Sequence, residues 1–147
     1  TPNMRIFEKM AVRIGGAFNH RFGLFDMILI KNNHVDHAGS ITTAIENTRL
    51  YLKRTGKRLQ IEVEVRNFAE LDEVMQVGGV DRVMLDNFDP EALARAVKLI
   101  GGRFETEASG GINHHTLRKY AETGVDFISV GALTHQIKSL DMSLRAV

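Results

Sequence analysis

The sequence contains no cysteine, which excludes disulfide bonds, thiolate nucleophiles and zinc–thiolate sites. It also has no apolar run long enough to span a membrane and no signal-peptide pattern at its start. Neither charge dominates, because 19 Lys and Arg residues stand against 18 Asp and Glu, with no basic block. We therefore expect a soluble, cytoplasmic protein that binds neither nucleic acid nor a membrane surface.

What the sequence does contain is a repeated alternation of short β-rich runs and amphipathic helical stretches. With 147 residues, 44% of them hydrophobic, it can form one globular domain with a sizeable core. The predicted strands are 27–30, 61–65, 82–85, 104–108 and 127–130. This alternation predicts a parallel sheet whose strands are joined by right-handed helical crossovers.

The helical stretches carry recognisable start signals. Ser40 is placed to cap a helix, Asn67 with glutamate three residues later resembles a capping box, and Asp89 precedes a proline. We expect a further helix to open at Asn113 and one over residues 4–14. The polar stretch "NNHVDHAGS" that ends at Ser40 is predicted to be a loop, and its two histidines, three residues apart, indicate no metal site by themselves.

Each β-rich run ends in a residue unlike its apolar interior. These residues are Lys31, Glu64, Asp86, Ser109 and Gly131. They recur at intervals of about 22 residues after a longer first interval, as repeated strand–helix units do. Because parallel strands present their carboxyl ends at one edge, we expect these five residues to mark the functional edge.

The fold class is therefore α/β, with about five strand–helix units. A complete eightfold barrel takes about 250 residues, so this chain holds only part of one. The alternatives are a partial or open parallel barrel and an open, doubly wound sheet.

The carboxylates Glu62 and Glu64 lie two residues apart on a predicted strand, so both point to the same face. One interpretation is a structural pair neutralised by Lys31 or Arg82. The other is a cation or hydroxyl site shared with Asp86, where oxygen ligands suit a hard ion such as Mg²⁺ or Mn²⁺.

The basic candidates are His20, Arg21 and Lys31. Lys31 follows the strand "MILI" and is a solvated strand end, a Schiff-base lysine or a fixed positive charge for an anion. His20 and Arg21 lie in the polar segment "NHR", where they are either surface residues or part of a site.

Two glycine-containing stretches follow the last two predicted strands: "SGGIN" at 109–113 and "VGALTH" at 130–135. Each brings glycine N–H groups to the start of a predicted helical turn, which favours binding of a phosphate. Ser109, Gly110 and Gly131 then form a phosphate end, with carboxylates in the middle and basic residues at the other end. This layout suits a phosphorylated sugar and a second, anionic reactant.

Five motifs in this order closely resemble the quinolinate phosphoribosyltransferase family. They are "NHRFGLFDMILIKNNH", "IEVEV", "VMLDNF", "EASGGI" and "AETGVDFISVGALTH", and the likeness continues to the closing "LDMSLRAV". The resemblance implies transfer of phosphoribose from phosphoribosyl pyrophosphate to quinolinate, giving nicotinate mononucleotide, pyrophosphate and CO₂ for NAD synthesis.

The resemblance also implies roles for individual residues. His20, Arg21 and Lys31 match the residues that hold the quinolinate carboxylates. Glu64 and Asp86 match the acids around the ribose and the Mg²⁺-pyrophosphate, and with Lys31 they are the implied catalytic residues. The 5′-phosphate loops correspond to Ser109, Gly110, Gly131 and His135.

On this comparison residues 1–147 are the C-terminal barrel domain. The family carries an α+β domain ahead of the barrel and a Thr-Arg-Lys-Thr stretch just before the Thr-Pro with which this chain begins. We therefore expect the 147 residues alone to be nearly inactive, and the full-length enzyme to be a homodimer or a larger homo-oligomer. The alternatives are a paralogue of the molybdenum-transport-associated type, a Schiff-base aldolase using Lys31, and an inactive fragment that retains an assembly surface.

Overall fold

The computed structural model describes residues 2–135 and 140–146. The chain divides into two compact units. One unit comprises residues 20–130 and contains the whole sheet, and the other combines residues 1–19 with residues 131–147.

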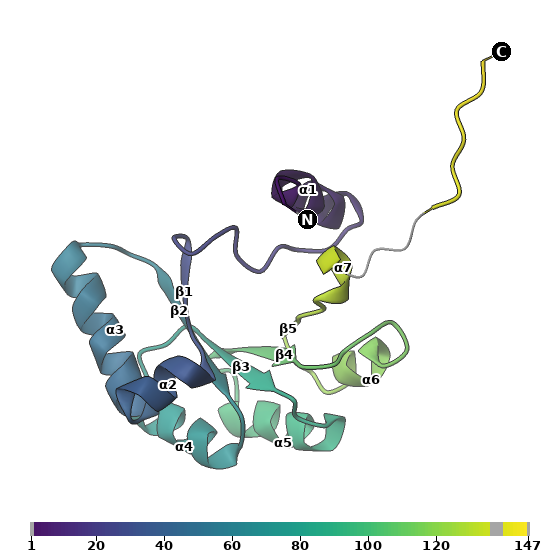
Figure 1. The fold of residues 1–147 in the computed structure, drawn as a ribbon. Coiled ribbons are helices and arrows are strands. Elements are labelled where there is room, and N and C mark those ends of the chain that lie inside the picture. The colour runs from purple at the N-terminus through teal and green to yellow at the C-terminus, as the bar shows by residue number, and fades with distance from the viewer. Residues whose placement is uncertain (1, 136–139, 147) are drawn as a thin grey trace. The chain divides into compact units, whose positions relative to one another are not determined.

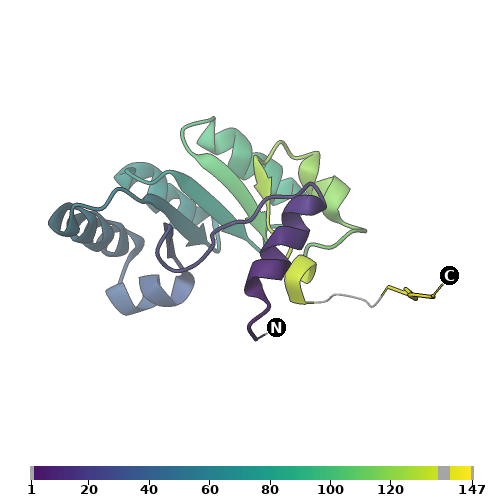
Figure 2. The same ribbon diagram turned by 90° about the horizontal axis from the view of Figure 1, so that it is seen from above.

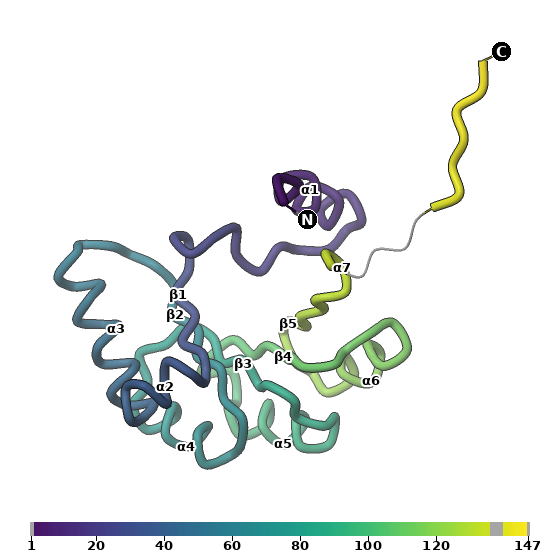
Figure 3. The backbone as a smooth tube through the Cα atoms, in the orientation of Figure 1, coloured from purple at the N-terminus to yellow at the C-terminus, as the bar shows by residue number. Residues whose placement is uncertain are grey.

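The unit of residues 20–130 is built on a five-stranded parallel sheet. Its strands are β1 (Met27–Ile30), β2 (Gln60–Val65), β3 (Arg82–Asp86), β4 (Glu105–Ser109) and β5 (Phe127–Ile128). The strands pair in chain order, and the path of the backbone can be followed in Figure 3. In a doubly wound sheet the strand order reverses partway across the sheet, and no such reversal occurs here. Of the two predicted architectures, the partial, open barrel is therefore the correct one.

Five helices connect or follow these strands: α2 (Asn32–Ala38), α3 (Ile41–Thr55), α4 (Phe68–Val77), α5 (Pro90–Ile100) and α6 (Leu117–Ala121). Figure 1 shows α3, α4 and α5 on one face of the sheet. Figure 2 shows the sheet after a turn of 90°, and its colour again changes in chain order, from blue at β1 to light green at β5.

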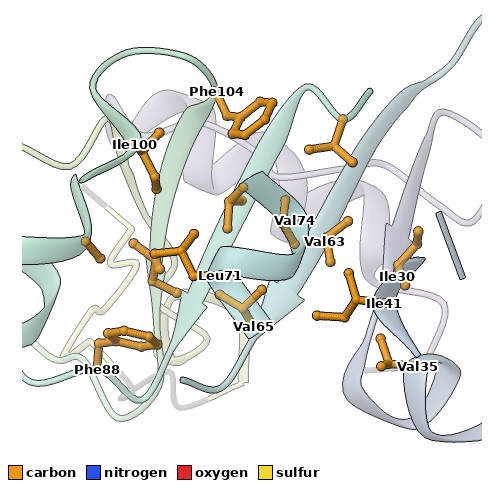
Figure 4. Close-up of a cluster of buried hydrophobic side chains, with 14 of the residues drawn as sticks. Ile30, Val35, Ile41, Val63, Val65, Leu71, Val74, Phe88, Ile100 and Phe104 are labelled. Carbon is orange, nitrogen blue, oxygen red and sulfur yellow. The ribbon is translucent and has the colours of Figure 1, made fainter. Parts of the chain in front are cut away.

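The strand residues alternate between this helical layer and the opposite face. Val63, Val65, Val83 and Leu85 are fully buried, and they pack with side chains of α3, α4 and α5 in the core drawn in Figure 4. The intervening positions of β2, β3 and β4 are mostly charged: Glu62 pairs in register with Arg82, which in turn pairs with Glu105, while Met84 lies between Glu64 and Glu107. One face of the sheet is therefore apolar and the other is charged.

The predicted helix starts are confirmed at three positions. Ser40, Asn67 and Asp89 each accept, through a side-chain oxygen, a hydrogen bond from the backbone N–H three residues later. The capping box is only half formed, because Glu70 accepts a hydrogen bond from the N–H of Arg66 (2.7 Å) rather than from that of Asn67.

The prediction of a loop over the polar stretch before Ser40 was wrong, because most of it is helix α2. His34 Nδ1 accepts a hydrogen bond from the N–H of Lys31 (2.9 Å), which caps the first turn, and Gly39 ends the helix with φ 92°. Val35 is the helix's one buried side chain, so the sequence carries too little apolar periodicity to reveal it.

The helix predicted to open at Asn113 begins instead at Leu117. Asn113 Oδ1 accepts a hydrogen bond from the N–H of His115 (3.0 Å), and Thr116 Oγ1 accepts one from the N–H of Asn113 (3.0 Å). These bonds form a turn that competes with helix. The glycines at 110 and 111 therefore do not lie at a helix start.

The second unit contains α1 (Arg5–Ile14) and α7 (Ala132–His135). Helix α1 confirms the predicted first helix to within one residue, and two hydrogen bonds fold the following segment back on it: Ala17 N–H to Val12 O (3.0 Å) and Asn19 Nδ2 to Lys9 O (3.1 Å). Across the described residues, every helix is too short or too polar to cross a membrane.

Candidate active site

Three glutamates are buried on the charged face of the sheet. Glu62 and Glu64 come from β2 and Glu107 comes from β4, and their exposed fractions are 0%, 6% and 1%. They are on this face because the residues that alternate with them, such as Val63 and Val65 in β2 and Ala108 in β4, belong to the apolar core. Burying a carboxylate is costly unless it is paired, so the partners of these three residues define the site.

His20 is the main partner of Glu62. Its Nε2 lies 2.6 Å from Glu62 Oε2 and 3.6 Å from Glu107 Oε1. The hydrogen bond with Glu62 raises the pKa of His20 above its ordinary value, although burial of the ring opposes this. The two carboxylates thus favour an imidazolium at this point of the charged face.

Glu107 is held from two other sides. Its Oε2 accepts a hydrogen bond from Arg82 Nη1 (3.0 Å), and its Oε1 accepts one from the hydroxyl of Ser129. Burial, followed by the negative charge of Glu62, raises the pKa of Glu107. Arg82 also lies over the ring of Phe127, with its guanidinium carbon 3.9 Å from the ring centroid.

Once its imidazole has lost the proton, His20 can hold a metal ion together with Glu62 and Glu107, since one donor atom from each lies within 4.8 Å of the others. Both oxygens of Glu107 are already engaged by Arg82 and Ser129. Glu62 Oε1, in contrast, is buried without a hydrogen-bond partner among the described residues. A cation would therefore find its open ligand position at Glu62.

Lys31 and Glu64 pair further along the same face. Lys31 Nζ lies 3.9 Å from Glu64 Oε2. Burial raises the pKa of Glu64, the charge of Lys31 lowers it, and the nearby charge of Asp86 raises it. The structural pairing of the two β2 glutamates is thus Lys31 with Glu64 and His20 with Glu62, while Arg82 binds Glu105 and Glu107.

Asp86 and Ser109 lie side by side at the carboxyl ends of β3 and β4, where they are partners in the strand register. Gly110 follows with φ +100°, a conformation that side chains rarely adopt. The carboxylate of Asp86 and the glycine turn after Ser109 were predicted from separate strand ends. In the structure they are neighbours.

The remaining predicted residues are placed as follows. Arg21 Nη1 donates to the carbonyl oxygen of Met27 (3.4 Å) at the start of β1. Gly131 and His135 belong to the other unit, where a Cβ on Gly131 would lie 2.6 Å from His135 Nε2. Gly131 therefore lies in close contact with the imidazole of His135.

Sequence reasoning did not single out Glu107, Ser129 or Asn87. A signal for Glu107 exists, because Glu105 and Glu107 alternate with apolar or small residues as the two β2 glutamates do. The sequence holds no comparable signal for Ser129 or Asn87, because single serines and asparagines are common near strand ends.

Comparison with known proteins identifies a family. The model of the family described as quinolinate phosphoribosyl transferase, C-terminal domain, matches residues 1–145. The chain is 45% identical to nicotinate-nucleotide pyrophosphorylase [carboxylating], chloroplastic, of Arabidopsis thaliana, over 98% of this chain and 45% of that protein. A probable nicotinate-nucleotide pyrophosphorylase [carboxylating] of Bacillus subtilis is 44% identical over 98% of this chain and 48% of its own length.

Solved structures agree with this match. The crystal structure of NadC from Streptococcus pyogenes superimposes with a TM-score of 0.90 at 43% identity, covering 99% of this chain and 50% of that one. The chain thus spans about half the length of the relatives it matches.

Proposed function

Because this chain belongs to the quinolinate phosphoribosyl transferase C-terminal domain family, we propose that it carries the barrel part of a carboxylating nicotinate-nucleotide pyrophosphorylase. The proposed reaction transfers phosphoribose to quinolinate and releases pyrophosphate and CO₂, leaving nicotinate mononucleotide. The observation that carries the proposal is the family match over residues 1–145, on a chain whose charged sheet face joins basic and acidic groups.

We assign the quinolinate carboxylates to His20, Arg21 and Lys31. His20 and Lys31 contact successive glutamates of β2, which supports a common location on the charged face. The raised pKa of His20 favours its cationic form, which suits an anionic substrate. Fixing both carboxylates of quinolinate would aim its ring nitrogen, so positioning supplies much of the rate.

We assign a Mg²⁺ ion to Glu64 and Asp86. The donor set fits, since two carboxylates supply oxygen ligands for a hard cation, and burial together with the nearby charge of Asp86 raises the pKa of Glu64. Bound Mg²⁺ would offset negative charge on the departing pyrophosphate. The same carboxylates would favour the positive charge that develops on the anomeric carbon of the ribose.

The 5′-phosphate is assigned to the turn formed by Ser109 and Gly110, next to Asp86. The roles of Gly131 and His135 in this subsite rest on the sequence resemblance alone. In the proposed step the pyridine nitrogen bonds to the anomeric carbon as the bond to pyrophosphate breaks. The cationic ring then accepts the electron pair of the carbon–carboxylate bond, CO₂ leaves, and the ring carbon takes up a proton.

Two further assignments go with this function. We propose that the complete enzyme is a homodimer or a larger homo-oligomer, and that it acts in the cytoplasm. The relative from Arabidopsis thaliana is named chloroplastic, so the compartment varies within the family.

The test is calorimetric titration of this chain with phosphoribosyl pyrophosphate, with and without Mg²⁺, after circular dichroism has shown that it is folded. Binding that requires Mg²⁺ is the expected result. A folded chain that binds neither phosphoribosyl pyrophosphate nor quinolinate would contradict the proposal for these residues.

A further inference from the structure

Asn87 occupies the turn at the carboxyl end of β3, immediately after Asp86. Its φ is +57°, and Asn3 is the one other non-glycine residue with positive φ among the described residues. Asparagine tolerates this left-handed conformation better than most residues, although it still carries a cost. An unfavourable backbone kept beside a candidate site needs a structural reason.

The neighbouring residue holds this turn in place. Phe88 is buried, and its ring packs edge-on against the ring of Phe68 in α4, with the centroids 5.5 Å apart. The backbone of Asn87 is therefore fixed between β3 and an anchored aromatic residue.

Asn87 makes one hydrogen bond to each of the two strand ends. Its side-chain Nδ2 donates to Asp86 Oδ2 (2.7 Å), and its backbone N–H donates to the carbonyl oxygen of Ser109 (2.8 Å). The first bond orients the carboxylate of Asp86, and the second holds the last residue of β4. One residue thus links both groups that we assign to the phosphorylated substrate.

Asn87 also explains why position 110 is a glycine. A Cβ on Gly110 would lie 2.6 Å from Asn87 Cγ and 2.8 Å from its backbone nitrogen. Contacts this short are not tolerated, and the nearby nitrogen is backbone that cannot move aside. The amide of Asn87 therefore packs directly against the backbone of the glycine turn.

We propose that Asn87 is a positioning residue that ties the Asp86 carboxylate to the turn at Ser109 and Gly110, so that the cation and phosphate parts of the site keep one fixed geometry. The proposal rests on the function assigned above and deepens it. The ligand class is a sugar phosphate whose phosphate and metal-bound diphosphate must be held at a set separation. Asn87 acts through its neighbours and needs no contact with the substrate.

The choice of side chain follows from this role. Aspartate would keep the shape but place a second carboxylate against Asp86. Glycine adopts positive φ without strain, keeps the backbone bond to Ser109, and loses only the side-chain amide. Asn87→Gly therefore removes the link with the smallest disturbance of the backbone.

The experiment compares Asn87→Gly with Asn3→Gly, a matched control at the other left-handed asparagine. Inorganic phosphate and Mg²⁺-phosphoribosyl pyrophosphate are titrated by calorimetry, and the exchange rates of the Gly110 and Gly111 amide protons are measured by NMR. In Asn87→Gly we expect affinity for the pyrophosphate compound to fall about tenfold, as for a lost charge-assisted hydrogen bond, and the two amides to exchange faster. Asn3→Gly should leave both readouts unchanged.

Amide exchange separates this proposal from the proposed function. If the wild-type chain binds no phosphoribosyl pyrophosphate, the proposed function fails, yet faster exchange at Gly110 in Asn87→Gly still supports the positioning role. Unchanged exchange and unchanged affinity in a folded Asn87→Gly chain would overturn it. Should that variant not fold, Asn87→Asp is measured in the same way, and an unperturbed Gly110 there would also overturn it.

Discussion

At the scale of single residues, the site depends on charges that share partners. His20 lies between two buried glutamates, and Arg82 reaches both Glu105 and Glu107. Removing one member of such a group leaves another buried charge uncompensated, which costs more than the pair itself contributes.

The pH dependence of stability follows from His20. Because its pKa is raised in the folded chain, the stabilisation it provides is fully present below about pH 6.5, its ordinary pKa, and is lost as the pH rises through the folded value. The raised pKa of Glu107 acts in the same direction at lower pH. We expect the free energy of unfolding, measured by urea titration, to fall as the pH rises above about 6.5.

In the variant His20→Gln this fall should be smaller, since glutamine cannot take up a proton. The neighbouring charges of Glu62, Glu107 and Arg82 remain in the variant. An equally steep fall in His20→Gln would show that another group titrates.

Arg82→Met should destabilise the chain by about 3 kcal/mol, because Glu107 would lose its guanidinium and remain buried. The double variant with Glu107→Gln should recover part of this loss, since the amide needs no counter-charge. Urea unfolding of the two single variants and the double variant measures the coupling. Strictly additive effects would mean that the two side chains do not interact in solution.

The sequence repeat correctly located the ends of the first four strands, because it marks positions such as Glu64 and Asp86, but Gly131 lies three residues beyond the end of β5. Prediction from sequence failed for contacts between distant segments. Nothing local indicates that His20 binds Glu62, 42 residues away. Whether the residues assigned to substrates bind them remains a prediction.

At the scale of elements, strands and long helices were predictable because their apolar positions repeat with a clear period. Helix α2 was missed because it buries Val35 alone, and α6 began late because Asn113 forms a turn instead. Short elements are determined by local hydrogen bonds and by packing against the rest of the chain, which a periodic pattern does not record.

The start of α5 offers a direct test of capping. Asp89→Ala removes the oxygen that accepts from the N–H of Ala92, and we expect a loss of about 1 kcal/mol in unfolding free energy. Asp72→Ala, at an exposed position inside α4, is the control and should change stability by less than half as much. Equal effects of the two substitutions would argue against a capping role.

At the scale of the whole molecule, stability should differ across the sheet. Strands β2, β3 and β4 are paired on both sides, and β2 and β3 include fully buried valines, whereas β1 and β5 have one neighbour each in the described residues. We expect hydrogen exchange to be slowest at Val63, Val83 and their neighbours and faster in β1 and β5. Slowest exchange in β5 would contradict this arrangement.

The alternation of charge and valine in β2 also protects the sheet against misassembly. If β2 paired one residue out of step, Glu62 and Glu64 would turn into the helical layer, and Val63 and Val65 would turn onto the charged face. Such a slip would bury two carboxylates among aliphatic side chains, far from His20 and Lys31. The two β2 glutamates therefore also make a one-residue shift of this strand unfavourable, so an apolar substitution of either would lower the fidelity of folding even if it raised stability.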